Sequence, residues 1–156
     1  MALSKVFVYG SLMCPDVLKV LLERVPFYSK AYVKGFQRLC VKNESFPACR
    51  PKVDEVSSTV EGFLLQEINE KELEIFDAFE DKEYTRQVVE VNVTTQNAET
   101  KADIAYMYVW NEEAKYTLEG PWSFEQHYLP KKKEFLKMCQ EFINEYKAFT
   151  LYETEK

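Results

Sequence analysis

The sequence predicts a single α+β domain. Its 156 residues have the size of one ordinary domain with one core. Stretches with strand-type alternation and stretches with helical periodicity follow one another without a regular βαβ order, which favours α+β over a doubly wound sheet. With 46% hydrophobic and 29% charged residues, the composition is that of a folded protein. We expect one domain over residues 1–149 and a flexible C-terminal tail over residues 150–156.

Strands are predicted where β-branched and aromatic residues alternate with polar ones. The last two strands form a hairpin, in which Val89, Val91 and Val93 share one face and the turn falls in the stretch QNAETK. Most of the middle of the chain is therefore sheet. The predicted strands cover residues 5–9, 29–34, 38–42, 59–66, 85–94 and 102–110.

Three helices are predicted from apolar residues at helical spacing. Pro15 suits the first position of a helix, and Asn69 with Glu72 forms a capping box. A similar box begins at Ser123, and Pro130 should kink or divide the helix that follows. The predicted helices cover residues 15–25, 69 to about 80, and 123 to about 146.

Charge and motif content argue against several classes of function. Twenty Lys and Arg against 26 Asp and Glu give a net charge of -6 without a basic groove, so we expect no nucleic-acid partner. No apolar run suits a membrane span and the first residues lack a secretory signal pattern, so we expect a cytoplasmic protein without membrane contact. Four cysteines and a single histidine lack zinc-ligand spacing, so we expect no metal site.

Glu80 fits its predicted helix badly. At about 100° per residue it lies on the same apolar arc as Leu73 and Phe76. It also stands at the C-terminal end of the helix, where the macrodipole disfavours a negative charge by roughly 0.3–1 kcal/mol. A carboxyl group directed toward a core is desolvated, which raises its pKa toward that of a general base at neutral pH. Alternatively, the helix ends earlier and Glu80 faces solvent or pairs with Arg86.

Tyr84 and Arg86 follow two residues apart and therefore share a strand face. Arg86 can hold a carboxylate through two parallel hydrogen bonds. It can equally pair with Asp77 or Glu90, which is the more common fate of a strand arginine. The residues alone leave both interpretations open.

The stretch YGSL, from Tyr9 to Leu12, ends the first predicted strand just before a helix. It lacks the glycines and the lysine of phosphate-binding and dinucleotide-binding loops. Gly10 lets the backbone turn, so that the N–H groups around Ser11 and Leu12 can face inward and bind a carboxylate or stabilise an oxyanion. A plain strand-to-helix turn capped by Ser11 is the alternative.

Cys14 is a competing candidate for chemistry. A thiol at the start of a helix is acidified, and His127 could serve as its base. Cys14 has an equally adequate role as a small apolar residue in the core. Ser11 would need the same histidine and lacks the GxSxG pattern of a serine nucleophile.

Six stretches spread over residues 5 to about 146 match the motifs of a known family. They are VFVYGSL, VKGFQRLCVKNESFPAC, VEGFLL, LEIFDAFEDKEYTR, AYMYVW and WSFEQHYL. Together they resemble the gamma-glutamylcyclotransferase-like family, in particular its plant avirulence-induced branch and the gamma-glutamylamine cyclotransferases. The most specific feature is the YGSL loop followed, about seventy residues later, by the FE…Y-x-R segment.

The resemblance implies a small closed mixed β-barrel with flanking helices, whose cavity holds a gamma-glutamyl group. In the family reaction, the free α-amine attacks its own γ-carbonyl, forms 5-oxoproline and releases an amine or peptide, without a cofactor. Glu80 matches the catalytic glutamate. The positions implied for substrate binding are Tyr9, Gly10, Ser11, Leu12, Tyr84 and Arg86.

Two questions stay open on the sequence. A non-catalytic module of the same fold could use the cavity to hold a small acidic metabolite. Met13 and Cys14 replace basic residues that some amine-specific relatives carry, which leaves the leaving group undefined.

Overall fold

The computed structural model, which describes residues 2–52 and 58–154, contains a closed mixed β-barrel. Its strands neighbour one another in the order β1, β5, β2, β6, β7. β1 and β7 pair in parallel and close the barrel, and the other neighbours are antiparallel. This confirms the α+β barrel. The strands are β1 (Ser4–Val8), β2 (Tyr28–Lys34), β5 (Thr59–Ile68), β6 (Tyr84–Thr94) and β7 (Thr100–Trp110).

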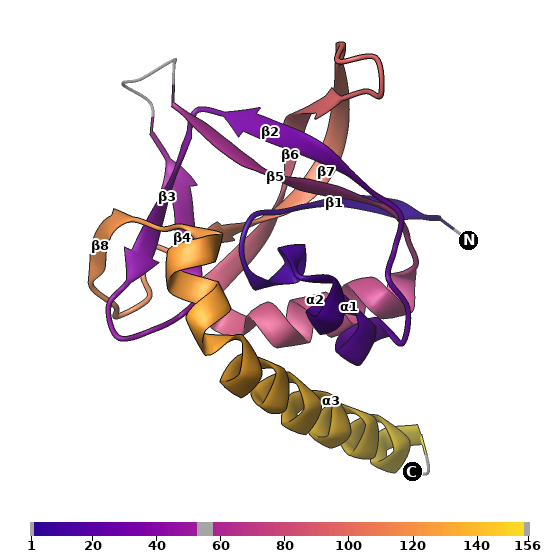
Figure 1. Cartoon of the computed structure of the whole chain (residues 1–156). Helices are drawn as coiled ribbons and strands as arrows, with labels where there is room; N and C mark the ends of the chain where they lie inside the picture. The colour runs from indigo at the N-terminus through magenta and orange to yellow at the C-terminus, as the bar shows by residue number, and fades with distance from the viewer. Residues whose placement is uncertain (1, 53–57, 155–156) are drawn as a thin grey trace.

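A second, smaller sheet lies beside the barrel, on the left in Figure 1. It has the order β4, β3, β8, with β3 at Phe36–Val41, β4 at Pro47–Pro51 and β8 at Leu118–Pro121. The sequence predicts β3 but not β4 or β8. Both are short edge strands that contain proline, which strand patterns disfavour but an edge accepts.

The helices gather below the barrel, and the longest one crosses beneath the other two (Figure 1). They are α1 (Pro15–Leu22), α2 (Glu70–Glu80) and α3 (Lys132–Thr154). A short 3-10 turn, Ser11–Met13, precedes α1, and another, Asp81–Glu83, follows α2. No helix in the described ranges combines the length and apolarity that a membrane span needs.

The predicted helix starts agree with the structure. Pro15 is the first residue of α1. Asn69 accepts the Glu72 N–H at 2.8 Å, while the Glu72 carboxylate accepts the Asn69 N–H at 3.1 Å, which completes the capping box. The predicted end of α1 is wrong, because Glu23 adopts a left-handed conformation that ends the helix and leaves Val25 exposed.

Pro130 divides the third predicted helix, as expected. A π-helical turn, Phe124–Tyr128, leads into a 3-10 turn, Leu129–Lys131, before α3 begins. α3 then continues to Thr154, so residues 150–154 are helical where a flexible tail is predicted, and residues 155–156 lie outside the described part. After Pro130 the chain has neither proline nor glycine to end the helix.

Among the described residues, two large apolar layers hold the barrel and the helices together, and a smaller cluster, Val41, Ala48 and Trp110, joins the second sheet to the barrel. The barrel interior is filled from several strands, and Phe7, Val91 and Met107 are fully buried there. The second layer lies between the barrel and the helices, where Leu18, Phe76 and Ile143 meet. β1 contributes alternate residues to each layer, which is why its chain is apolar on both faces.

Candidate active site

A small cavity of about 30 Å³ lies where β1 ends, between the barrel and the end of α2. Its walls come from four separate parts of the chain, which the barrel brings together. The lining residues are Phe7, Val8, Tyr9, Gly10, Ser11, Leu12, Phe46, Pro47, Glu80, Tyr84 and Tyr108. Six of the seven residues predicted to form a site are among them.

Glu80 is the last residue of α2, so the helix does not end before it. Asp81 leaves the helix with φ 57°, which turns the chain toward β6 and keeps Glu80 against the cavity. Among the described residues, its carboxyl group has no hydrogen-bond partner, and the alternative of a pair with Arg86 is not observed, because Arg86 pairs with Asp77. Burial, followed by the nearby Glu83 carboxylate, raises the pKa of Glu80 to about 8.

Three tyrosines surround Glu80, and each phenol donates a hydrogen bond to a fixed acceptor. Tyr9 donates to the carbonyl of Tyr108, and Tyr84 donates to the carbonyl of Pro47 at 2.6 Å. Tyr108 donates to Asp77 Oδ1 at 2.6 Å. Burial is the first cause that raises the pKa of all three phenols, and neighbouring carboxylates, Glu80 among them, raise it further. The phenols are therefore neutral positioning groups.

The loop from Gly10 to Leu12 faces the same cavity. The N–H groups of Cys14 and Met13 close the turn onto the carbonyls of Ser11 and Gly10, both at 3.0 Å. Within residues 2–52 and 58–154, no backbone acceptor is bound by the N–H groups of Gly10, Ser11 or Leu12. The loop thus brings several free amide donors to a cavity that also contains Glu80.

Gly10 is required here because the loop passes close to β4. A Cβ at position 10 would lie 2.9 Å from two carbon atoms of the Pro47 ring, which is too short for a normal contact. Pro47 in turn holds the Tyr84 phenol through its carbonyl. The close approach of the loop and β4 therefore fixes one wall of the cavity.

Arg38 on β3 supports the loop and was not among the predicted site residues. Its guanidinium donates to the Tyr9 carbonyl at 2.8 Å and to the Glu61 carbonyl at 3.0 Å, and lies 5.3 Å from the centre of the Trp122 ring. Because a trans peptide places C=O and N–H on opposite sides, a Tyr9 carbonyl held by Arg38 directs the Gly10 N–H away from Arg38. An arginine within the apolar stretch FQRLCV is the only signal that the sequence offers for it.

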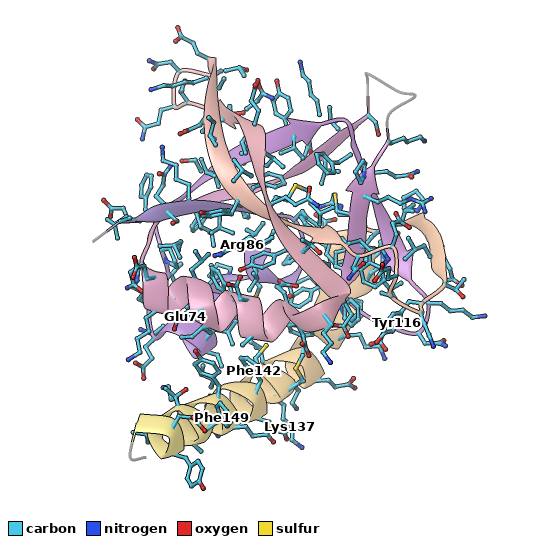
Figure 2. All side chains as sticks on the ribbon, turned by 180° about the vertical axis from the view of Figure 1, so that it is seen from behind. Glu74, Arg86, Tyr116, Lys137, Phe142 and Phe149 are labelled. Carbon is cyan, nitrogen blue, oxygen red and sulfur yellow. The ribbon has the colours of Figure 1, made fainter. Side chains whose placement is uncertain are left out.

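Arg86 lies outside the cavity. Its guanidinium is 3.5 Å from Asp77 Oδ2 and 4.6 Å from the centre of the Tyr106 ring. Figure 2 shows Arg86 between the β6–β7 ribbon and α2. Of the interpretations left open by the sequence, the ion pair with Asp77 is confirmed, and a direct role for Arg86 at the substrate stays a prediction.

The structure favours a packing role for Cys14. It is 2% exposed, belongs to the core between barrel and helices, and does not line the Glu80 cavity. His127 lies elsewhere, with its Nδ1 accepting the Ser123 N–H at 2.8 Å. No hydrogen bond between described residues joins this thiol and this imidazole. In the same ranges, no group of three or more His, Cys, Asp or Glu residues is placed to hold a metal ion.

Comparison with known proteins connects this site to one family. Residues 6–124 match the family model described as "Gamma-glutamyl cyclotransferase, AIG2-like". The chain is 40% identical over 147 residues to AIG2-like protein D of Arabidopsis thaliana, covering 92% of this chain and 91% of that protein. It is also 36% identical over 137 residues to AIG2-like protein C of the same plant, covering 88% of this chain and 76% of that protein.

Solved structures agree with the fold. A solution structure of another Arabidopsis thaliana protein superposes with a TM-score of 0.66 at 31% identity, over 92% of this chain and 93% of that one. A structure titled "Gamma-glutamyl cyclotransferase" superposes with a TM-score of 0.59 at 18% identity, over 87% of each chain, and is similar in fold. The family match, spanning most of the barrel and every lining residue of the cavity, identifies this chain as a member of the AIG2-like gamma-glutamyl cyclotransferase family.

Proposed function

We propose that the protein is a cofactor-independent gamma-glutamyl cyclotransferase that converts a gamma-glutamyl compound into 5-oxoproline and a free amine or peptide. The observation that carries the proposal is that the desolvated carboxyl group of the half-buried Glu80 and the unpaired amides of residues 10–12 line one cavity. Membership of the AIG2-like family and the name of a solved structure with this fold support the same reaction.

The reaction needs one base, one oxyanion site and a folded substrate. Glu80 accepts a proton from the α-amino group, whose nitrogen then attacks the γ-carbonyl carbon of the same molecule. The loop amides stabilise the oxyanion as the new C–N bond closes the five-membered ring. When the old C–N bond breaks, Glu80 gives its proton to the departing nitrogen. The ring nitrogen still carries the second proton of the former ammonium group, and the ionised Glu80 passes this proton to the released amine, which leaves as an ammonium ion. Because the attack is intramolecular, holding the substrate in a folded conformation supplies much of the rate enhancement.

The pKa of Glu80, about 8, suits both proton transfers. A carboxyl group with an ordinary pKa would be too weak a base for an ammonium group. Binding of a positively charged α-ammonium group beside Glu80 would lower its pKa and favour the ionised form that accepts the proton. Burial therefore favours the protonated form of Glu80 in the free protein, and binding of the α-ammonium group favours the ionised form.

Arg38 and the tyrosines take positioning roles in this proposal. By holding the Tyr9 carbonyl, Arg38 fixes the orientation of the peptide whose N–H belongs to Gly10. A hydrogen bond to a charged donor also polarises the peptide and strengthens its N–H as a donor. Tyr84 keeps Pro47 against the loop and borders the substrate pocket.

The proposal is tested by incubating the purified protein with gamma-glutamyl amines, gamma-glutamyl dipeptides and glutathione, and by measuring 5-oxoproline chromatographically. We expect turnover of at least one class of substrate, with kcat lowered about 10²- to 10⁴-fold in Glu80→Gln. Cys14→Ser should retain activity. Failure of the whole panel, or full activity of Glu80→Gln, would refute the assignment.

A binding module remains the second candidate, because the cavity with its free amides would also hold an acidic metabolite. It predicts that 5-oxoproline or glutamate raises the melting temperature equally in the parent and in Glu80→Gln, without turnover. A thermal shift accompanied by 5-oxoproline formation would decide for the enzyme.

A further inference from the structure

A second hollow, of about 540 Å³, opens beside the Glu80 cavity. One side comes from the connection between β3 and β4, and the other from the π-helical turn and the beginning of α3. Phe46 lines both hollows and is the residue that they share. We call the larger hollow the outer groove.

The cavity around Glu80 is too small for a gamma-glutamyl group as it stands. Its volume of about 30 Å³ holds about one water molecule, so one of its walls must move before a substrate enters. β1 and the end of α2 are fixed by pairing and by the core. Phe46 stands instead in an irregular connection at the boundary with the outer groove.

Phe46 lies at the edge of a small buried cluster formed by Val41, Ala48 and Trp110. It is partly buried, and its ring meets Tyr116 edge-on with 6.4 Å between ring centres. Tyr116, labelled in Figure 2, is itself 40% exposed. The backbone beside Phe46 is anchored, because the Trp122 indole donates to the Ser45 carbonyl at 2.9 Å. Because Phe46 is the residue that both hollows share, rotation of its side chain would join them while the β3–β4 connection keeps its place.

The outer groove offers apolar walls. Phe135 forms its buried end, and Met138 on α3 exposes 42% of its surface there. Together with Phe46 these side chains suit an apolar group, while most of the remaining lining is polar and includes one lysine and two glutamates: Asn43, Glu44, Ser45, Gln126, His127, Lys131 and Glu134. Binding of a large apolar group in such a groove is favoured in proportion to the apolar surface area that is removed from water.

From this continuity we infer that the outer groove binds the leaving portion of the substrate, and that Phe46 separates it from the gamma-glutamyl pocket and selects leaving groups by size. The ligand class is gamma-glutamyl conjugates of large apolar amino acids. The inference rests on the proposed function, because it places the departing nitrogen between Glu80 and Phe46.

The test compares gamma-glutamylphenylalanine with gamma-glutamylglycine, which differ in one benzyl group and carry the same charges. For the parent we expect a kcat/KM about tenfold higher with phenylalanine as the leaving group. Met138→Asp should reduce this ratio about fivefold or more, because it places a charge against the benzyl group. Val88→Asp is the matched control, since Val88 is 65% exposed on β6 and does not line the groove.

Phe46 is tested by the same ratio. Phe46→Trp should lower the ratio of kcat/KM for gamma-glutamylphenylalanine to that for gamma-glutamylglycine, because the larger side chain narrows the connection between the two hollows. Phe46→Ala should raise this ratio. Melting temperatures establish that each variant is folded, and the exposed Met138 position keeps the test valid if a Phe46 variant unfolds.

The outcomes separate the two proposals. If the parent turns over both substrates with a ratio near one, or if Met138→Asp and Val88→Asp shift the ratio equally, the groove assignment is overturned while the proposed function stands. If the parent forms 5-oxoproline from no substrate of the full panel, the proposed function fails and the groove assignment fails with it.

Discussion

Glu80 occupies a position where a negative charge costs free energy. It ends α2, faces a buried cavity and has a pKa of about 8, against about 4.3 for glutamate in an unfolded chain. The folded protein therefore holds this proton over a pH range in which the unfolded chain has lost it. Such a cost at one residue is expected where function, rather than stability, determines the side chain.

Replacing Glu80 by Gln should stabilise the protein increasingly as the pH rises from 5 to 8.5. The stability associated with the neutral carboxyl group is fully present below pH about 4.3 and is lost as the pH rises through about 8. At 1.36 kcal/mol per pKa unit, we expect Glu80→Gln to gain about 2–5 kcal/mol in unfolding free energy at pH 8.5. Urea denaturation of both proteins at pH 5 and 8.5 measures it, and a pH-independent difference would contradict the buried placement of this carboxyl group.

Arg38 acts on the loop at a distance from the reacting atoms. We expect Arg38→Met to lower kcat about 10- to 100-fold with a smaller change in KM, because the Gly10 amide loses its fixed direction. Arg38→Lys should recover part of the rate. Steady-state kinetics test this, with Arg50→Met on the neighbouring β4 as the control. A folded Arg38→Met protein with parental kcat would limit Arg38 to a structural role.

At the scale of the element, the position of the loop depends on how closely β1 and β5 approach. A Cβ at Gly62 on β5 would lie 2.1 Å from the Val8 carbonyl oxygen and 3.0 Å from the Phe7 ring. Both β1 residues line the Glu80 cavity. The pairing of β1 with β5 thus sets where the chain leaves the barrel and enters the loop.

Gly62→Ala should destabilise the protein by about 3 kcal/mol or more, since backbone must move to accommodate the methyl group. Gly120→Ala is the matched control, because in the described part of the chain no atom beyond its two chain neighbours lies within 4 Å of a Cβ there, and its effect should stay within about 0.5 kcal/mol. Thermal and urea unfolding measure both. Equal effects of the two substitutions would argue against the close β1–β5 approach.

At the scale of the whole molecule, periodicity and capping chemistry predict most elements because those signals are local. The Asn69–Glu72 box, Pro15 and the division at Pro130 all depend on residues within one or two turns. The edge strand β8 is not predicted because its pairing with β3 is a long-range property, whereas β4 pairs with the adjacent β3 and is not predicted because its prolines weaken the strand pattern. Closure of the barrel through the β1–β7 pair is also long-range, so only the family resemblance predicts it.

The candidate site divides in the same way. Glu80 is detectable because it contradicts its own helix, and the YGSL loop because glycine interrupts a strand. Phe46 contradicts no local rule, and Arg38 is marked only as a charge within an apolar stretch. Their places beside the loop and the cavity follow from the packing of β3 and its connection to β4. Arg86 belongs to the predicted site, yet in the structure it pairs with Asp77 on α2 and lies outside the cavity.

The central claim is that Glu80 promotes ring closure within the substrate, without attack by water. Turnover in H₂¹⁸O, followed by mass spectrometry of the products from the parent and from Glu80→Gln, tests it most directly. We predict that the parent forms 5-oxoproline free of ¹⁸O and that Glu80→Gln forms 5-oxoproline with a yield at least about 10²-fold lower. Release of glutamate labelled with ¹⁸O, or an equal yield of 5-oxoproline from Glu80→Gln, would contradict the account.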